Sequence, residues 1–480
     1  MIQSHRKCWA RGKKLLFRLA LFGALFALSA GARAEWEIKH FHDALSLSSG
    51  VWDGVDSEET VVPLAELVQA PQAPWIRAHF GACHLGEKSY VTITSLLDGD
   101  SQRLDARSLV DYQNATVYFN GDALDVQLHV APGEVGIFAA INGVTYGDPS
   151  QAFQIPEPSP LASLCGADNR IASTDARVGR LFGGGCTGWL VSNERALTAG
   201  HCGNPDGNVT GVMQFNVPAS TSNGNPVQPP ANDQYPVIAN SVTFESDGIG
   251  EDWSIFRVGP NSNTNLRPHV AQGFFRMTTY VPPADATMRV TGYGLDNSPS
   301  GSGGNGAQCC DEDNDNACEF DCNAQSLTEQ TSTGRFDELS GTTLEYEVDT
   351  TPANSGSPVY RTATGITVGI HTAGGCDSLF AGNENHGTWF GYSLLSNALQ
   401  AQTGSSVIWV DTVNVSTLQF GHVLHPAKTV TLAVSIVPNG GRVRLLPGSY
   451  TKAAGNVFTA GADGKAMTFD CPLGLAVIGN

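Results

Sequence analysis

Basic side chains are scarce in this chain of 480 residues, in which 27 Lys and Arg stand against 46 Asp and Glu. The formal net charge of −19 gives an acidic surface that repels nucleic acid, so a nucleic-acid-binding function is not expected. The metal-binding patterns Cys-x-x-Cys and His-Glu-x-x-His are also absent from the sequence. We therefore predict no metal site and no cofactor.

The first 34 residues have the composition of a secretory signal peptide. A basic start leads into an apolar run, Leu15–Ala30, broken only by Arg18, and Ala32-Arg33-Ala34 suits signal peptidase. The alternative is a short membrane anchor, but the run after Arg18 is shorter than the roughly 20 residues of a spanning helix. We expect export to the periplasm or the medium, with cleavage after Ala34 and no membrane span in the exported chain.

Turn residues and composition divide the rest of the chain into four parts. Residues 35–154 predict an N-terminal antiparallel β domain, and residues 155–164 predict a Pro-rich linker. Residues 165–402 are Gly-rich with many short strands, which is typical of an all-β barrel fold, and Ser393–Gln402 predicts a closing helix. Strands are expected in the N-terminal part at Tyr90–Thr94, Ala115–Phe119, Leu124–Val130 and Val135–Asn142.

Residues 407–480 predict a short C-terminal β module, with one strand at Val430–Val437 and another at Arg442–Leu446. The run VPNGGRVRLLPGSY resembles the opening coil of parallel β-helix domains. One or two such coils cannot bury a core alone, so this module is expected either to pack on another part of the protein or to be a remnant.

Eleven cysteines are present, and ten remain once Cys8 leaves with the signal. In an exported chain we expect them to form disulfides. Four lie in an acidic insertion, residues 308–322, whose Asp spacing is close to that of a calcium loop. Asn316 stands where such a loop needs Gly and Cys322 where it needs Glu, so a disulfide-tied loop is preferred, with open pairing among Cys309, Cys310, Cys318 and Cys322. Four others have no assigned partner and could tie the flanking modules to the central part, namely Cys83, Cys165, Cys376 and Cys471.

Three short motifs carry side chains suited to nucleophilic catalysis. In GCTGWLVSNERALTAGHC, His201 ends an apolar strand inside the span from Cys186 to Cys202, which a disulfide would hold together. Asp252 follows in EDWSIF and Ser355 in the tight ANSGSPV turn. A serine hydroxyl needs a base to take its proton, a carboxylate to orient that base, and backbone donors for the oxyanion. These residues offer the three side chains, in the order His, Asp, Ser.

The region from Cys165 to Gln402 resembles the chymotrypsin-fold, trypsin-like serine endopeptidases, and among them the bacterial glutamyl-endopeptidase-like branch. The matching runs are LTAGHC, DWSIF, VTGYG, DTTPANSGSPVY and VGIHTAGG. The resemblance implies a double six-stranded β-barrel with His201 as general base, Asp252 as its orienter and Ser355 as nucleophile. It further implies an oxyanion hole made by the backbone N–H groups of Ala353 and Ser355.

Two residues beside the nucleophile depart from the family pattern. Ala353 stands where the family has Gly, which costs on the order of 1 kcal/mol if its φ is positive. Asn354 replaces the Asp with which a freed N-terminus pairs in animal trypsins, so activation through that ion pair is not expected. Arg170, Arg177 and Arg180 are nevertheless candidate processing sites of a zymogen.

The specificity pocket has two interpretations. Asp349, next to Thr350, has the spacing of the carboxylate that selects Lys or Arg in trypsins. His371 instead matches the pocket histidine of glutamyl endopeptidases, which would favour acidic side chains through an imidazolium or an N–H donor. The second interpretation is preferred.

The sequence thus predicts a secreted serine endopeptidase that acts on protein or peptide substrates through an acyl-enzyme. The alternative is a weak or inactive protease-fold binding protein, attached to a cell surface or polymer by its flanking β domains. Residues 35–154 could be an inhibitory propeptide or a permanent accessory module, and the sequence leaves both open.

Overall fold

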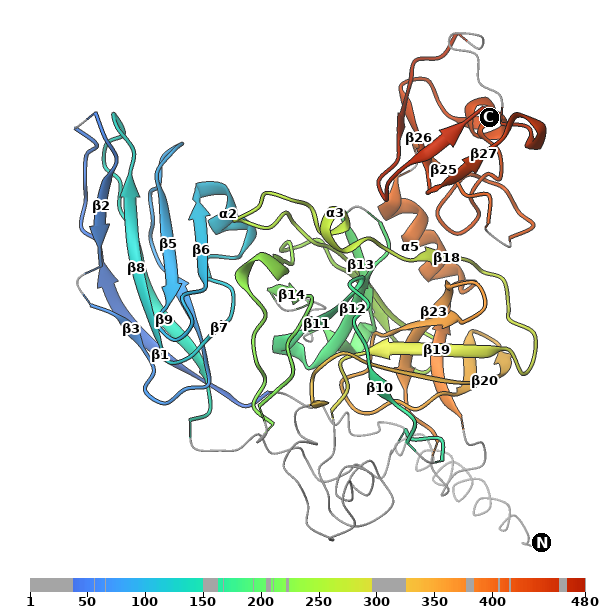
Figure 1. The fold of residues 1–480 in the computed structure, drawn as a ribbon, viewed down its shortest axis with the longest axis horizontal. Helices are drawn as coiled ribbons and strands as arrows, with labels where there is room; N and C mark the ends of the chain where they lie inside the picture. Colours follow the sequence, from blue (N-terminus) through green and yellow to red (C-terminus); the bar gives the residue numbers. More distant parts are fainter. Residues whose placement is uncertain are drawn as a thin grey trace, which may run out of the picture. The chain divides into compact units, whose positions relative to one another are not determined.

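The computed structural model describes the chain between residues 38 and 479 with several gaps (Figure 1). The described ranges are 38–55, 57–64, 66–149, 163–166, 168–192, 194–203, 209, 211–221, 224–295, 325–376, 384–404, 406–413, 416–456 and 464–479. The chain divides into Met1–Trp36 and Glu37–Asn480, and every described element belongs to the second unit. The predicted signal peptide and the acidic insertion lie outside the described residues, as does the linker except for residues 163 and 164.

The N-terminal strands form two sheets whose pairings are all antiparallel, as the alternating pattern predicts. The first sheet contains β1 (His40–Ser48), β9 (Ala140–Gly147), β4 (Trp75–Phe80) and β7 (Phe119–Asn120). The second contains β2 (Thr60–Pro63), β8 (Ala123–Val130), β5 (Tyr90–Ser95) and β6 (Ser101–Asp105), with β3 (Val68–Gln69) also paired to β8 (Figure 1). Buried and partly buried residues alternate along β5 and β8, the period of a strand with one face in a core.

Two of the predicted N-terminal strands are largely wrong. β9 begins at Ala140 rather than at Val135, because Gly136 adopts a positive φ and the next two residues make only isolated bridges. In the segment 115–119 only Phe119 belongs to a strand. The sequence analysis also missed a short helix, α2 (Ala106–Asp111), which begins where the Asp105 side chain accepts a hydrogen bond from the Ser108 amide.

The strands of the central part of the chain form two β-sheets. One has seven strands, in the order β15 (Gln234–Pro236), β14 (Val212–Gln214), β11 (Val178–Leu181), β12 (Cys186–Leu190), β13 (Arg195–Thr198), β17 (Asp252–Arg257) and β16 (Thr243–Ser246). It is called the open sheet here, because its outer strands β15 and β16 do not pair with each other. The other closes on itself, because its two outer strands also pair with each other. Its ring is β20 (Gln330–Ser340), β19 (Thr287–Gly292), β22 (Pro358–Arg361), β23 (Ile366–Ala373), β24 (Asn385–Trp389) and β21 (Thr343–Glu347).

The fold is therefore mostly β, with one six-stranded barrel and a second sheet that forms a half-barrel, whereas two six-stranded barrels were expected. Just beyond β15 and β17, Val237 and Val258 form an isolated antiparallel bridge that draws these two strands of the second sheet together. Two further short strands lie on the barrel, β10 (Ile171–Ala172) against β20 and β18 (Arg276–Met277) against β23. Short helical segments connect the strands, namely α3 (Pro268–Gln272), η1 (Phe182–Gly184), η2 (Gly200–Cys202) and η3 (Ala231–Asp233). No helix within the described ranges is long and apolar enough to cross a membrane.

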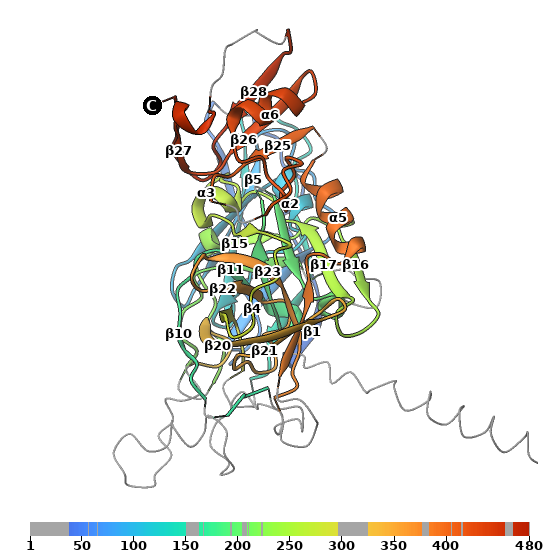
Figure 2. The ribbon, with the colours of Figure 1, turned by 90° about the vertical axis from the view of Figure 1, so that its right-hand side faces the viewer.

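A large cluster of buried apolar side chains surrounds Trp189 of β12, which is fully buried and packs edge-on against Phe275. Leu395 and Leu399 belong to this cluster and lie on α5 (Ser393–Thr403), the helix that the sequence predicts. Figure 2 shows α5 alongside β16 and β17, and Gln402 near its end donates a hydrogen bond to Thr243. The helix thus covers the His-bearing and Asp-bearing edge of the open sheet.

Buried polar groups join the N-terminal strands to the open sheet. The Gln234 side chain, which is 0% exposed, donates to the Tyr118 carbonyl at 2.7 Å and accepts from the Tyr118 amide at 3.0 Å. The Tyr112 hydroxyl donates to the Gln234 carbonyl at 2.8 Å. The rings of Trp75 and Tyr118 meet Phe182 edge-on. Paired buried polar groups fix one geometry, because separating them without water would leave each unsatisfied.

The C-terminal strands pair in parallel, as stacked coils would. β25 (Val407–Val410), β26 (Gly441–Leu445) and β28 (Met467–Asp470) form one sheet, and β27 (Gly448–Tyr450) with β29 (Ala476–Ile478) forms another. Trp409 and Leu446 belong to the cluster around Trp189, and the Arg276 guanidinium lies 3.3 Å from the Asp411 carboxylate. This packing on the central part agrees with the expectation that so short a module needs a partner.

The predicted strand at Val430–Val437 is wrong, because this segment is helix α6 (Val430–Ile436). Thr429 caps the helix by accepting a hydrogen bond from the Leu432 amide. The residues that become buried, Val430, Ala433 and Val434, recur at helical rather than strand spacing. β-Branched residues suggested a strand, but the cap and the tertiary contact decide the helix. A further 3-10 turn, η5 (Lys452–Ala454), follows β27.

Two disulfides are present in the described part of the chain. Cys186–Cys202 is the predicted one, and Cys165–Cys376 joins two segments of the central part rather than a flanking module. Cys83 and Cys471 are free thiols, which corrects the expectation that both would be paired. The half-buried Cys83 lies near the Ala140 carbonyl, and partial burial raises the pKa of its thiol, so it is less reactive than an exposed cysteine.

Candidate active site

His201 lies on η2, directly after β13 and next to the disulfide that ties η2 to β12. The turn is possible because Gly200 has no side chain: a Cβ there would overlap the Glu245 carbonyl oxygen and come within 2.8 Å of Asp252 Oδ1. The chain can therefore bring the His201 backbone against Asp252 only with glycine at position 200.

Asp252 begins β17, and its carboxylate holds His201 twice. Oδ2 is 2.5 Å from His201 Nδ1, and Oδ1 accepts the His201 backbone amide at 2.9 Å. Only 6% of Asp252 is exposed, and its own backbone exchanges two hydrogen bonds with the Thr388 hydroxyl of β24. With the carboxylate at Nδ1, the imidazole keeps its proton on that nitrogen, which leaves Nε2 as the acceptor.

Ser355 lies on the loop between β21 and β22, and its backbone is fastened to the open sheet. Its carbonyl accepts the Thr187 amide of β12 at 2.9 Å and lies 3.6 Å from Cys202 Sγ. The next residue, Gly356, donates its amide to the His371 carbonyl at 2.8 Å. The half-buried Ser355 is thereby held beside Cys202, the residue that follows His201.

The two predicted oxyanion donors have free amides. Among the described residues, the backbone N–H groups of Ala353 and Ser355 donate to no acceptor. The neighbouring amides of Asn354, Gly356 and Ser357 each donate a hydrogen bond. Ala353 has a φ of 75°, which is the positive value that the family pattern requires at this position. An alanine held there is strained, and the surrounding loop must supply the compensation.

Replacing Ala353 with glycine is expected to raise the free energy of unfolding by about 1 kcal/mol, because glycine adopts a positive φ without steric cost. Denaturant unfolding of the full chain measures the change. The control is Ala398→Gly in the interior of α5, which should lower stability by about the same amount. A loss of stability in Ala353→Gly would contradict a strained alanine.

The family model for trypsin matches residues 165–382. These residues form a trypsin-family domain. A search of curated proteins finds no match for the chain.

Several solved structures are similar to the trypsin-family domain. A Glu endopeptidase in complex with MPD is 18% identical, with coverage of 50% of this chain and 99% of that chain and a TM-score of 0.35. Neuropsin, a serine protease of mouse brain, is 12% identical over 48% and 96% of the two chains, with a TM-score of 0.31. A mutant of human heparin binding protein is 10% identical over 49% and 97%, with a TM-score of 0.33.

Asp349 of the trypsin-family domain is occupied by the chain itself. Its Oδ1 accepts the Cys165 amide at 2.7 Å and its Oδ2 accepts the Asn169 amide at 2.9 Å, and only 3% of the residue is exposed. Thr350 is also engaged, through its amide to the Ser163 carbonyl. Each oxygen of this carboxylate already accepts one backbone amide, so the carboxylate is poorly suited to bind the cationic side chain of a substrate.

His371 is buried, and its Nδ1 lies 2.7 Å from the Tyr346 hydroxyl, which also reaches the His386 carbonyl at 3.1 Å. Burial lowers the pKa of His371 to about 3, so the ring is neutral at physiological pH. His371 was expected to select acidic side chains through either an imidazolium charge or an N–H donor. A neutral ring leaves only the hydrogen bond. Tyr346 and Asn385 are site residues that the sequence analysis missed, because nothing in their local sequence distinguishes them.

The geometry offers one group of potential metal ligands in the described part of the chain, formed by Cys186, His201 and Cys202. The two sulfur atoms are joined in a disulfide and cannot bind a metal as thiolates. The His201 ring is instead committed to the Asp252 carboxylate.

Proposed function

We propose that the chain is a secreted serine endopeptidase that hydrolyses peptide bonds through an acyl-enzyme on Ser355. The observation that supports this most is the doubly bonded pair of His201 and Asp252 beside the loop of Ser355. In an acyl transfer, the orientation of the base and the free amides of the oxyanion site supply most of the catalysis.

The proposed reaction is described by its proton transfers. The Ser355 hydroxyl passes its proton to His201 Nε2 as Oγ attacks the scissile carbonyl carbon, and the Ala353 and Ser355 amides donate to the oxyanion. When the intermediate collapses, the C–N bond breaks and His201 returns the proton to the leaving amine. Water then repeats the sequence on the ester, with His201 as base, and releases the acid product. Since the Asp349 carboxylate is occupied by backbone amides of the chain, we propose that the substrate residue before the cleaved bond is acidic and that His371 selects it.

A fluorophosphonate probe tests the function directly, because a serine nucleophile displaces fluoride and becomes covalently labelled. Labelling and peptide cleavage are expected in the exported wild-type chain, and both should be lost in Ser355→Ala. The matched control is Ser357→Ala, two residues further along the same loop, which should be labelled and active. A peptide library gives the preferred residue in the same experiment. Absence of Ser355-dependent labelling and cleavage would favour the inactive binding protein.

A further inference from the structure

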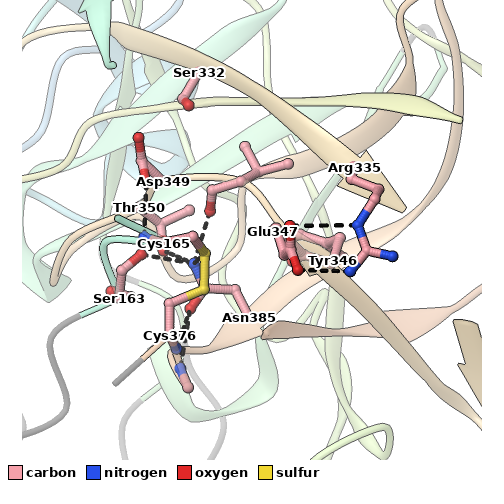
Figure 3. Close-up of a disulfide and its surroundings, with 12 residues drawn as sticks. Ser163, Cys165, Ser332, Arg335, Tyr346, Glu347, Asp349, Thr350, Cys376 and Asn385 are labelled. Atoms are coloured by element: carbon pink, nitrogen blue, oxygen red, sulfur yellow. Dashed lines mark hydrogen bonds and ion pairs between the residues drawn. A yellow bond between two sulfur atoms is a disulfide. The ribbon is translucent and has the colours of Figure 1, made fainter. Parts of the chain in front are cut away.

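The segment Ser163–Arg170, called the strap here and described except for residue 167, lies along the loop that bears Ser355. Three hydrogen bonds made by backbone groups of the strap join them. The Ser163 carbonyl accepts the Thr350 amide at 3.0 Å, and the two Asp349 oxygens accept the Cys165 and Asn169 amides. Figure 3 shows Asp349 and Thr350 facing Ser163 and Cys165. The strap is therefore bound at the start of the nucleophile loop, which we define as Val348–Ser357.

The strap is also fastened to the barrel at its first residues. The fully buried Asn385 of β24 donates to the Ser163 carbonyl and to the Val348 carbonyl, both at 2.7 Å. Its oxygen accepts the Gly375 amide, next to Cys376, and Cys376 forms the disulfide with Cys165 (Figure 3). One side chain and one covalent bond thus hold the strap, the loop and the end of β23 together.

At its other end the strap reaches the neighbours of the nucleophile. The buried Arg170 pairs with Asp168 and donates to the Thr351 hydroxyl at 2.8 Å and to the Leu295 carbonyl at 3.1 Å. The Asn354 side chain donates to the Thr351 carbonyl and approaches the same hydroxyl. A continuous chain of contacts therefore runs from the strap through Thr351 to Asn354, which lies between the strained Ala353 and Ser355.

All of these contacts come from residues inside the chain and not from a freed N-terminus. A strained backbone conformation persists only where surrounding contacts hold it in place. Here the strap, an internal segment of the chain, supplies the contacts that hold the nucleophile loop. Cleavage after Arg170 would separate the strap from β10, and Arg180 is 1% exposed, so neither is placed for an activating cut. Arg177, the third candidate, has a side chain that is 34% exposed and pairs with Asp175.

We propose that Asp349 is a positioning residue that binds the strap and thereby holds the nucleophile loop in its working conformation, so that activity does not require cleavage between residues 163 and 180. The proposal rests on the proposed function, since it concerns the same serine. It assigns Asp349 to loop order and not to the recognition of Lys or Arg in substrates.

Full-length Asp349→Asn and Asp349→Ala variants test this role. Asparagine keeps one acceptor oxygen, so we expect kcat and the fluorophosphonate labelling rate to fall about 10-fold in Asp349→Asn and about 100-fold in Asp349→Ala. KM should change less than kcat, and the ratio of cleavage at Glu to cleavage at Arg should stay constant. The control is Asp337→Asn, the same charge change on β20, which should leave activity unaltered.

A milder variant tests the same chain of contacts with less risk that the protein misfolds. Thr351→Val removes only the hydroxyl between Arg170 and Asn354, and we expect a several-fold lower labelling rate with an unchanged melting temperature. Mass spectrometry of the active wild-type enzyme should find the strap still joined to residue 180.

Three results would overturn the proposal while Ser355-dependent labelling persists: full activity in both Asp349 variants, a selective loss of cleavage at Arg, or activity that appears only after a cut between residues 163 and 180. Absence of labelling in the wild-type chain is different, because it removes the proposed function itself.

Discussion

An Asp252→Asn variant should hydrolyse peptides about ten-thousand-fold more slowly than the wild-type chain at neutral pH. The asparagine oxygen can still accept the His201 backbone amide, as Asp252 Oδ1 does now. Its NH₂ group then faces His201 Nδ1 and forces the ring to accept a hydrogen bond there, so the proton moves to Nε2. A ring protonated on Nε2 cannot take the proton of the Ser355 hydroxyl.

The measurement is kcat on a peptide substrate, together with the melting temperature, which should hardly move because the side chain keeps its shape. Asp247→Asn is the matched control, since this exposed aspartate lies in the turn before β17 and five residues from Asp252. A fall of less than 10-fold in Asp252→Asn would show that another group orients the imidazole.

The candidate catalytic residues could be proposed from the sequence because each lies in a short motif with its own local reason. A histidine between two cysteines, an aspartate opening an apolar strand and a serine in a glycine turn can each be recognised from neighbouring residues. The sequence also predicted α5 and the antiparallel N-terminal strands, where the hydrophobic period is regular. How far each sheet of the central part closes was not predictable from local patterns, because closure depends on the pairing of strands that are distant in the chain.

The role of Asp349 was hidden for the same reason. Its spacing from Ser355 is that of a specificity residue, yet its partners Cys165 and Asn169 lie 184 and 180 residues away in sequence. Asn385 joins the strap over 222 residues. No local pattern carries such contacts, and they decide whether a carboxylate is free for a substrate or bound to the chain.

The contacts of the N-terminal strands bear on the choice between propeptide and accessory module. In the described ranges their hydrogen bonds to the trypsin-family domain reach Gln228–Val237 and Asn261–Asn263, and none reaches His201, Asp252 or Ser355. A propeptide that masks the site should contact those residues. The buried and mutually satisfied groups at Gln234 favour the accessory module instead.

A Gly200→Ala variant is expected to lower the free energy of unfolding by roughly 3 kcal/mol, the upper part of the usual cost of over-packing. The new methyl group would overlap the Glu245 carbonyl oxygen, and this residue cannot easily retreat. Glu245 pairs with Trp253 across the two strands, and its carboxylate accepts hydrogen bonds from the Trp253 indole and the Tyr392 hydroxyl, each at 2.8 Å.

The strain in Gly200→Ala must then be relieved on the other side, where Asp252 Oδ1 lies 2.8 Å from the added carbon. We therefore expect kcat to fall about 100-fold in the molecules that remain folded, since small displacements of a catalytic group are costly. Denaturant unfolding and active-site titration separate the two effects. Gly448→Ala is the matched control, because its nearest neighbour would be the Thr412 hydroxyl at 3.5 Å, an ordinary contact. Equal stability and activity in the two variants would mean that Gly200 does not set the approach of His201 to Asp252.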